Sequence, residues 1–428
     1  MRAAFWLLAL FAIAAASALF AGNNQAVISV FWPPHRVDVS FNLAVFLLVG
    51  LFVLVYVALR ALSAVVTLPL EAKRWRAQQK ERAMYGGLMD ALAHQLAGRY
   101  IRATKSAQNA LVQEKSLARL ANESQVPGYS ASRSSQMQSL AHLLVAESAQ
   151  SLQNRALRDE HLQLALQSSA PRHAQEVREG VQFRAVRWAL DDRDAAAALN
   201  TLQLLPHGAG RRTLALRMKL RATRQLRQTQ QALETARLLA KHRAFSPSTA
   251  QSIVRGLGVE RLNDAHDPAQ LEQAWAALDA SERAMPELVI HAASRLMALH
   301  GDAVLARSWL LLVWLQAMQA NSTLSDSVRI KLIDALEPGL DSLDAPWLAR
   351  IEAAQIARPR DANMQYLAGV ACLKRQLWGK ARQWLSLSVL GLQDTGLQRK
   401  AWLALAVLAE QRGDSEAQAE SYKRAALL

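Results

Sequence analysis

Two long apolar runs near the N-terminus dominate the hydrophobic pattern of the chain. Residues 3–21 contain no charged side chain, and residues 41–59 form a second uncharged run that Arg60 closes. As a helix, each run would be about 28 Å long, which is close to the hydrocarbon thickness of a bilayer. A soluble helix rarely stays apolar on all faces for so long. We therefore predict two membrane-spanning helices.

The segment between the runs, residues 22–40, is short, and Pro33-Pro34 prevents a helix from continuing through it. Trp32 is a residue type typical of a membrane–water interface. We expect a plain external connector that closes a transmembrane hairpin over residues 1–68, with a partner-binding loop as the alternative. A cleaved signal peptide ending near Ala16–Ala18 is the alternative for the first run, and it leaves the second run as an anchor.

Basic residues set the expected orientation. The connector holds one basic side chain besides its histidine, Arg36, whereas the second run is followed by a dense basic stretch. The positive-inside rule therefore places this stretch, both termini and the bulk of the chain in the cytoplasm. The residues expected to contact anionic headgroups are Lys73, Arg74, Trp75, Arg76, Lys80 and Arg82. DNA binding is the rival interpretation, but no helix-turn-helix, zinc finger or RNP motif accompanies the charge.

From residue 84 onward the pattern is one helix after another, separated by short turns. The positions typical of the tetratricopeptide repeat, a helix–turn–helix unit of 34 residues, are Gly98, Tyr100, Ala103, Gly301, Ala306, Gly369, Ala381, Trp402, Gly413, Tyr422 and Ala425. One helix pair cannot bury its own apolar stripe, so successive pairs stack and share a core. The pattern predicts a tetratricopeptide-like α-solenoid.

A polar, Ser-rich segment divides the expected solenoid. Residues 122–136 contain Pro127-Gly128 and predict a linker. It separates residues 69–121, the basic stretch with a first helix pair, from the main array over residues 137–428. Ala, Leu, Gln and Arg are abundant and Gly and Pro are sparse, which favours helices throughout. The expected fold class is all-α, a two-helix transmembrane hairpin followed by the solenoid.

Motifs for catalysis or metal binding are missing from the sequence. There is no dinucleotide fingerprint, P-loop, HExxH or GxSxG motif, and no two histidines are spaced for one metal on one helix. The single cysteine, Cys372, lies in an apolar-periodic segment, where packing explains it. We expect a protein that is not an enzyme and needs no metal or cofactor.

One charge pattern is a candidate binding surface. Residues 210–228 hold seven basic side chains and no acidic one, with Arg217, Arg221 and Arg224 spaced to share a helix face with Gln228. If this helix is the first of its pair, the stripe lines the concave groove of the solenoid. It can then bind an acidic peptide or another carboxylate through charge-assisted hydrogen bonds. A solvated outer face is the alternative.

The order of parts resembles one known family. Two apolar helices with a Pro-containing loop, a basic Trp-bearing stretch, an "AGRY" helix pair, "WGKARQWL" and a final "GD" turn resemble the HemY family of bacterial inner-membrane tetratricopeptide proteins. That family is associated with late haem (protoporphyrin) biosynthesis. The resemblance implies a non-catalytic scaffold or adaptor that organises or regulates late haem-pathway enzymes on the cytoplasmic side. Its partners would be these proteins and membrane lipids, with no nucleic acid.

Two other functions stay open at this point. One is a tetrapyrrole carrier that binds haem or porphyrin directly, with the propionates on Arg217, Arg221 and Arg224 and the ring stacked on Trp188. The other is an assembly factor for envelope complexes unrelated to haem.

Overall fold

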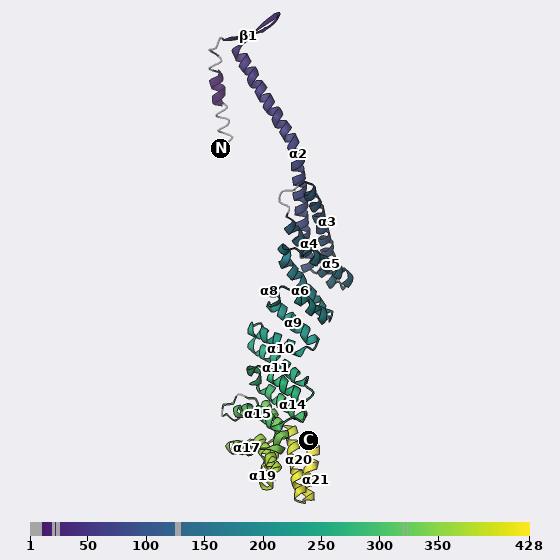
Figure 1. Ribbon diagram of the computed structural model, residues 1–428, viewed down its shortest axis with the longest axis vertical. Coiled ribbons are helices and arrows are strands. Elements are labelled where there is room, and N and C mark those ends of the chain that lie inside the picture. The colour runs from purple at the N-terminus through teal and green to yellow at the C-terminus, as the bar shows by residue number, and fades with distance from the viewer. Residues whose placement is uncertain (1–10, 19–21, 23–25, 125–129, 320, 323) are drawn as a thin grey trace. The chain divides into compact units, whose positions relative to one another are not determined.

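The protein is mostly helical (Figure 1), as predicted. The computed structural model describes residues 11–18, 22, 26–124, 130–319, 321–322 and 324–428. The chain divides into two compact units, Met1–Val181 and Gln182–Leu428. The predicted linker at residues 122–136 lies inside the first of these units.

The first unit contains a β-hairpin that the all-α prediction missed. Strands β1 (Val27–Trp32) and β2 (His35–Ser40) pair antiparallel around a Pro33-Pro34 turn. Alternating Val, Ile, Phe and Trp residues favour strands. The segment expected to be a plain connector is thus an ordered hairpin.

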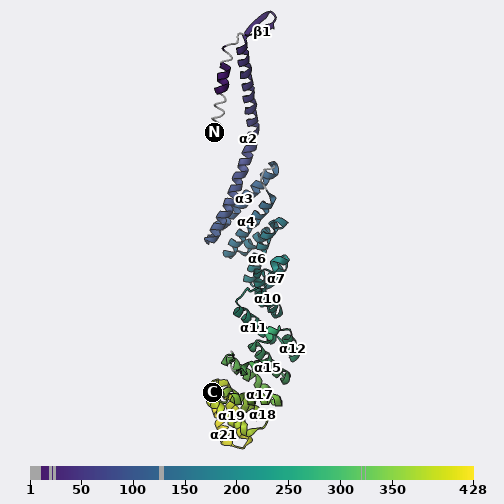
Figure 2. The same cartoon turned by 90° about the vertical axis from the view of Figure 1, so that its left-hand side faces the viewer.

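A single long helix follows the hairpin. Helix α2 (Phe41–Leu96) has 56 residues, about 84 Å at 1.5 Å per residue. The helix that the sequence predicted to end at residue 59 therefore continues through the basic stretch, which is rich in good helix formers such as Ala, Glu, Lys, Arg and Gln. Figure 2 shows α2 running from the hairpin into the first helices of the unit.

The N-terminal part of α2 has the character of a membrane span. Phe41–Ser63 has a mean hydropathy of 2.7 and no part of it is buried inside the protein. It is the one candidate span among the residues that the structure describes. The predicted first span, residues 3–21, lies largely outside the described residues, of which residues 11–18 are helical. The two-helix hairpin is not confirmed.

The rest of the first unit is a helical layer on the C-terminal half of α2. It consists of α3 (Tyr100–Ser124), α4 (Ala131–Ser151) and α5 (Arg155–Ser168). Ala103, Ala107 and Ala110 are fully buried on α3, which lets this helix approach α2 closely. The predicted linker over residues 122–136 is too long, because α4 already begins at Ala131.

Polar contacts fix α4 in this layer. The Ser148 hydroxyl donates a hydrogen bond of 2.6 Å to the side-chain oxygen of Gln95 on α2. The Ser134 hydroxyl donates to the buried carboxylate of Glu114 on α3. The two helices that flank the predicted linker are therefore packed together.

The chain then continues as an array of helices. It comprises a short 3-10 helix η1 (Arg172–Ala174), α6 (Gln175–Asp191), which runs across the boundary between the units, α7 (Ala195–Gln203), α8 (His207–Gly210), α9 (Thr213–Gln225), α10 (Thr229–Lys241), α11 (Pro247–Asn263), α12 (Pro268–Ala276), α13 (Ala280–Arg283), α14 (Pro286–Ala298), α15 (Ala303–Met318), α16 (Asp326–Leu336), a second 3-10 helix η2 (Glu337–Ser342), α17 (Ala345–Ala357), α18 (Ala362–Lys374), α19 (Trp378–Gly391), α20 (Thr395–Gln411) and α21 (Ser415–Leu427). Successive helices pack as α9–α10, α14–α15, α18–α19 and α20–α21.

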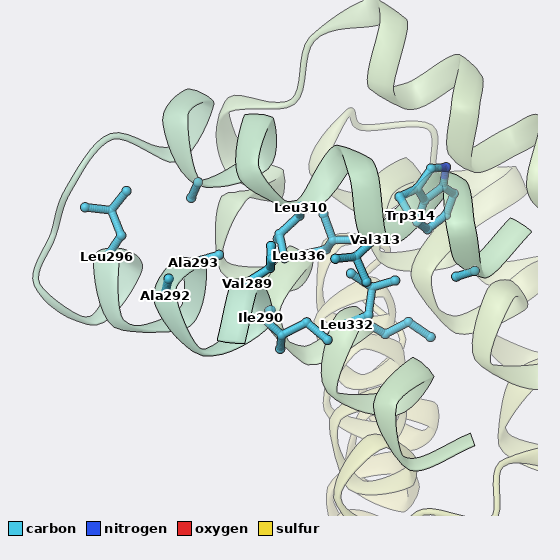
Figure 3. Packing of buried hydrophobic residues seen from close by; sticks show 14 of the residues in the cluster. Val289, Ile290, Ala292, Ala293, Leu296, Leu310, Val313, Trp314, Leu332 and Leu336 are labelled. Atoms are coloured by element: carbon cyan, nitrogen blue, oxygen red, sulfur yellow. The ribbon is translucent and has the colours of Figure 1, made fainter. Parts of the chain in front are cut away.

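One apolar core extends through most of the second unit, from Leu216 to Leu408. Figure 3 shows part of it, where Leu310, Val313 and Trp314 from α15 meet residues of α14 and α16. Trp314 is 2 % exposed. A core that passes from pair to pair is what makes stacked helix pairs stable, since each pair covers the apolar face of the next.

A recurring turn connects helices along the chain. A residue with positive φ follows the first helix, and the next amide hydrogen-bonds back to a carbonyl of that helix, as from Asp194 to Ala189 (2.8 Å) and from Asp414 to Ala409 (3.0 Å). The positive-φ residues are Gly98, Gln153, Arg193, Arg227, Arg243, His300, Gln376 and Gly413. Arg193 and Arg227 are 34 residues apart, the length of a tetratricopeptide unit.

Small residues mark the crossing of α18 and α19. A Cβ atom added at Gly369 would lie 2.7 Å from Cγ of Leu385, so the two backbones are in close approach. Ala381, Leu385 and Ser388 are all fully buried on one face of α19. Tyr422, on α21, is by contrast 43 % exposed, whereas Ala425 on the same helix is buried.

Replacing Ala381 with tryptophan should lower the free energy of unfolding by about 1–3 kcal/mol, because the site has no space for a larger side chain. Urea denaturation of the purified protein measures the change. Arg382→Trp is the matched control, since Arg382 is exposed on the same helix. Equal stability of the two variants would contradict close packing at this crossing.

Candidate functional site

The arginines of the predicted stripe lie on α9, but they point to three different neighbours. The Arg217 guanidinium donates a 2.6 Å hydrogen bond to the carbonyl of Ala244 and lies over the Phe245 ring. Arg221 pairs with Asp191 at 3.2 Å, and Arg224 pairs with Glu260 at 4.0 Å. Gln228 is not on this helix, because α9 ends at Gln225.

These contacts decide what the stripe can do. The side chains of Arg221 and Arg224 are about half exposed, at 54 % and 55 %, so each ion pair contributes only about 0–1 kcal/mol. An incoming carboxylate can therefore replace Asp191 or Glu260 at little cost. The stripe is best described as three separate exposed arginines, of which Arg221 and Arg224 have exchangeable partners and Arg217 is held by Ala244 and Phe245.

An open cleft of about 350 Å³ adjoins the end of the stripe. Arg224, Arg227, Thr229, Ala232, Leu257, Glu260, Asn263 and Asp264 line it. Both signs of charge and several amide or hydroxyl groups are present, so the cleft suits a polar peptide segment. It offers few apolar walls for a large flat ring.

Trp188, the residue expected to stack on a tetrapyrrole, is buried in the protein. Only 5 % of its surface is exposed. A ligand can reach its ring only if the surrounding packing opens, so that part of the carrier prediction is wrong.

A second cleft, of about 300 Å³, escaped the sequence analysis. The end of α15, the start of α16 and the turns before α18 and α20 form it. The charged residues that line it are Asp326, Arg329, Arg358, Arg360, Asp361 and Asp394. Arg329 lies 29 residues before Arg358 in the sequence, so no local charge run joins it to Arg358 and Arg360; "RPRD" at 358–361 was the available signal.

Two of the acidic groups in this second cleft, which we call the arginine cleft, are already engaged. Asp361 and Asp394 accept hydrogen bonds from the first amides of α18 and α20 as N-caps. Arg358 donates to the carbonyls of Ala317 and Gln319, at 3.1 and 3.2 Å.

Arg329 is only loosely paired in the arginine cleft. It holds Asp326 at 3.5 Å, and the Asp326 side chain is 89 % exposed. The cleft therefore combines three guanidinium groups with three carboxylates, and an acidic side chain can bind Arg329 there by displacing Asp326.

The basic stretch expected at the membrane surface lies on the exposed side of α2. Trp75 is 62 % exposed, whereas Ala77 and Met84 of the same helix are buried in the first unit. Along the helix, Lys73 lies about 15 Å beyond Ser63, and Arg82 about 28 Å beyond it. Headgroup contact by these residues stays a prediction, and Lys73 to Arg76 are the nearest to the apolar span.

Two histidines that the sequence analysis treated as isolated form a pair between α4 and α5. Nδ1 of His142 lies 3.0 Å from Nδ1 of His161, and the ring centroids are 5.0 Å apart. Burial, together with the nearby His161 and Lys115, lowers the pKa of His142 to about 4. Burial also lowers the pKa of His161. No group of three or more metal-ligating side chains occurs among the described residues.

Stability of the first unit should fall on acidification. The unfolded chain binds protons at these histidines near pH 6.5, whereas folded His142 does so only near pH 4, so the pair's contribution is complete above about pH 6.5 and is lost towards pH 4. The expected loss is about 1–2 kcal/mol after discounting for partial exposure. Urea denaturation between pH 7.5 and pH 4.5 measures it.

His142→Gln should flatten this pH dependence, whereas His35→Gln, at an exposed histidine in the same unit, should leave it unchanged. An unaltered pH slope in His142→Gln would show that the pair is not responsible.

Comparison with known proteins gives one family match. Residues 27–124, which cover the β-hairpin, α2 and α3, match the family model described as HemY protein N-terminus. No curated protein matches the chain. Solved structures that are similar include the TPR domain of P58(IPK), with 12 % identity over 77 % of this chain and 99 % of that chain and a TM-score of 0.23. Another is Naa15/Naa10 bound to HypK-THB, with 12 % identity over 77 % of this chain and 56 % of that chain and a TM-score of 0.25.

Proposed function

Since residues 27–124 match the family model described as HemY protein N-terminus, we propose that the chain is a HemY family protein and a membrane-anchored, non-catalytic scaffold. In this proposal it organises or regulates late haem (protoporphyrin) biosynthesis enzymes on the cytoplasmic side of a bacterial inner membrane. The observation that carries the proposal is that the apolar span and the first helix of the helical layer are one helix.

Helix α2 supports tethering directly. Its first part, Phe41–Ser63, is apolar and exposed, and its last part buries Ala77, Met84 and Ala91 in the first unit. No linker intervenes between the anchor and the folded layer. A partner bound to this protein is therefore kept near the bilayer, where its effective concentration for other membrane-bound partners rises without new contacts.

In the proposed topology the chain crosses the membrane twice, first through residues 3–21 and then through Phe41–Ser63, and both termini are cytoplasmic. The distribution of basic residues supports a cytoplasmic location for the helical array. The basic stretch of α2 follows Phe41–Ser63, whereas the only basic residues of the β-hairpin before this span are Arg36 and one histidine. A cytoplasmic array has access to soluble enzymes.

Partner proteins would dock through acidic segments. The arginine cleft supports this role, because three guanidinium groups line a space of about 300 Å³ and the ion pair between Arg329 and the exposed Asp326 is long, at 3.5 Å. The exposed arginines of α9 offer a second, weaker site, since their present ion pairs are exchangeable.

Cross-linking in cells, followed by mass spectrometry, tests the scaffold. Full-length protein should cross-link to late haem-pathway enzymes, and Arg329→Glu/Arg360→Glu should lose most of these cross-links. Arg412→Glu/Lys423→Glu is the control, because it makes the same charge change at exposed sites on α20–α21. Recovery of envelope-assembly proteins without any haem enzyme would favour the assembly-factor alternative.

Direct tetrapyrrole binding remains the alternative with a spectroscopic test. The buried Trp188 and the dispersed arginines of α9 speak against it. Titration of the purified full-length protein with haem, followed at the Soret band, should show no saturable shift at micromolar haem. A saturable shift that Arg217→Ala/Arg221→Ala abolishes would establish the carrier instead.

A further inference from the structure

The β-hairpin before α2 has two different faces. Its register pairs Ile28 with Val39, Val30 with Val37, and Trp32 with His35, and each cross-strand pair shares a face. This face, which we call the apolar face, carries Ile28, Val30, Trp32, Val37 and Val39, with His35 at the tip. Val30, Val37 and Trp32 are 51 %, 53 % and 76 % exposed, so no described residue covers them.

The opposite face is organised by one arginine. Arg36 donates to the carboxylate of Asp38 at 3.2 Å and to the hydroxyl of Ser29 at 3.2 Å, and its guanidinium lies over the Phe31 ring. These contacts hold the polar groups together on one side. The hairpin thus has one exposed face that is apolar apart from His35, and an opposite face that mixes these polar groups with the exposed side chains of Val27 and Phe31.

The position of the hairpin is fixed relative to the apolar span. Ser40 is both the last residue of β2 and the N-cap of α2, where its hydroxyl accepts a hydrogen bond from the Leu43 amide at 3.3 Å. The Phe41 amide also donates to the carbonyl of Ala26 at 2.9 Å, which ties the start of β1 to the start of the helix. Both strands therefore meet the span at its first residue.

We propose that the hairpin lies in the membrane interface, with its apolar face against the boundary between lipid headgroups and acyl chains. The inference rests on the membrane anchoring by Phe41–Ser63 that the proposed function includes. If that helix spans the bilayer, the hairpin begins at the level of the headgroups. Amphipathic elements at that level bury their apolar side by about 5–10 Å.

Two physical arguments favour the membrane interface over both the hydrocarbon core and open water as the location of the hairpin. A two-stranded sheet has two open edges, whose backbone N–H and C=O groups need water or headgroups as partners, so the hairpin cannot enter the hydrocarbon region. Four exposed apolar side chains on one face, Ile28, Val30, Trp32 and Val37, would in turn be unfavourable in water. Trp32 at the tip is of the residue type enriched at membrane interfaces.

Adjacent residues on opposite faces give a matched test. In full-length protein with Cys372→Ala, single cysteines at Val30, Val37, Ser29 and Asp38 would carry an environment-sensitive fluorophore after reconstitution in anionic nanodiscs. Labels at Val30 and Val37 should show blue-shifted emission and quenching by lipids with a shallow nitroxide. Labels at Ser29 and Asp38 should instead be quenched by aqueous iodide.

Two results would overturn the proposal. Equal iodide quenching at all four positions would place both faces in water. Protection of Val30 and Val37 from both quenchers would show that protein, and not lipid, covers the apolar face. A label at Leu51, quenched by lipids with a deep nitroxide, reports separately on the anchor. Failure at Leu51 would reject the anchor, whereas failure at Val30 and Val37 alone rejects only the interfacial hairpin.

Discussion

Arginine at both Leu51 and Leu54 should release from the membrane a form of the protein that begins at Ala26, whereas the same form with native leucines should stay bound. Both leucines lie near the middle of Phe41–Ser63 and are more than 60 % exposed, so no protein surface shields a charge there. Each arginine at the centre of a span costs about 2.5–3.5 kcal/mol, so two together offset about 5–7 kcal/mol, which is comparable with the whole favourable contribution of the remaining apolar side chains.

Carbonate extraction and flotation on a density gradient measure the bound fraction. Gln78→Arg/Gln79→Arg is the control, because both residues are exposed on α2 beyond the span. Persistent binding of the doubly substituted form would show that α2 is not the anchor. Full-length protein with the same two arginines then reports on residues 3–21, since it stays bound only if that run also inserts.

Removal of Arg237 should destabilise the second unit by about 3–5 kcal/mol, because it leaves a buried carboxylate without its partner. Glu282 is 2 % exposed, and its two carboxylate oxygens accept hydrogen bonds of 2.8 and 2.6 Å from Arg237. The same carboxylate accepts from the Asp279 amide at 2.9 Å. The hydrogen bond to Glu282 raises the pKa of Arg237, so the arginine stays charged at any pH where the protein is folded.

Urea denaturation of Arg237→Ala measures this loss. Arg255→Ala is the matched control, since Arg255 and Glu287 form a 2.7 Å pair whose partners are both about 40 % exposed, and it should cost no more than about 1 kcal/mol. Adding Glu282→Gln to Arg237→Ala should restore part of the stability by removing the buried charge. A loss as small as that of Arg255→Ala would mean that water reaches Glu282.

The helical array was predictable because its signal is repeated. Small residues such as Ala103 and Gly369 recur at helical spacing, and the chain has few residues that oppose helices. The turns were predictable only where glycine occupies them, as at Gly98 and Gly413. At Arg193 and Gln376 the left-handed conformation is adopted by residues with a Cβ atom, and these residue types do not indicate a turn in the sequence.

The β-hairpin and the length of α2 were not predictable by the same reasoning. Six-residue strands between two apolar helices give a short signal, and Pro33-Pro34 indicates a turn without indicating what flanks it. The apolar pattern ends at Arg60, whereas the helix continues to Leu96. Where a helix passes from lipid into water, its side chains change from apolar to polar, but the helix itself can continue.

The candidate sites depend on contacts between distant segments. The arginine stripe on α9 was visible locally, but its partners Asp191 and Glu260 belong to other helices. The arginine cleft and the pair of His142 and His161 arise only when neighbouring helices pack. Sequence spacing along one helix carries no information about either.

Because α2 is unbroken, the number of its residues between the apolar span and the helical layer fixes the direction in which that layer faces around the helix axis. Each residue of an α-helix turns the chain by about 100° and advances it by about 1.5 Å. One residue inserted after Ser63 would swing the surface formed by α3, α4 and α5 by more than a quarter of a revolution while barely changing its height. Single insertions or deletions in this segment would therefore change the direction in which the surface of α3, α4 and α5 faces. Insertions or deletions of seven residues would roughly preserve that direction, because seven residues make close to two full helical turns.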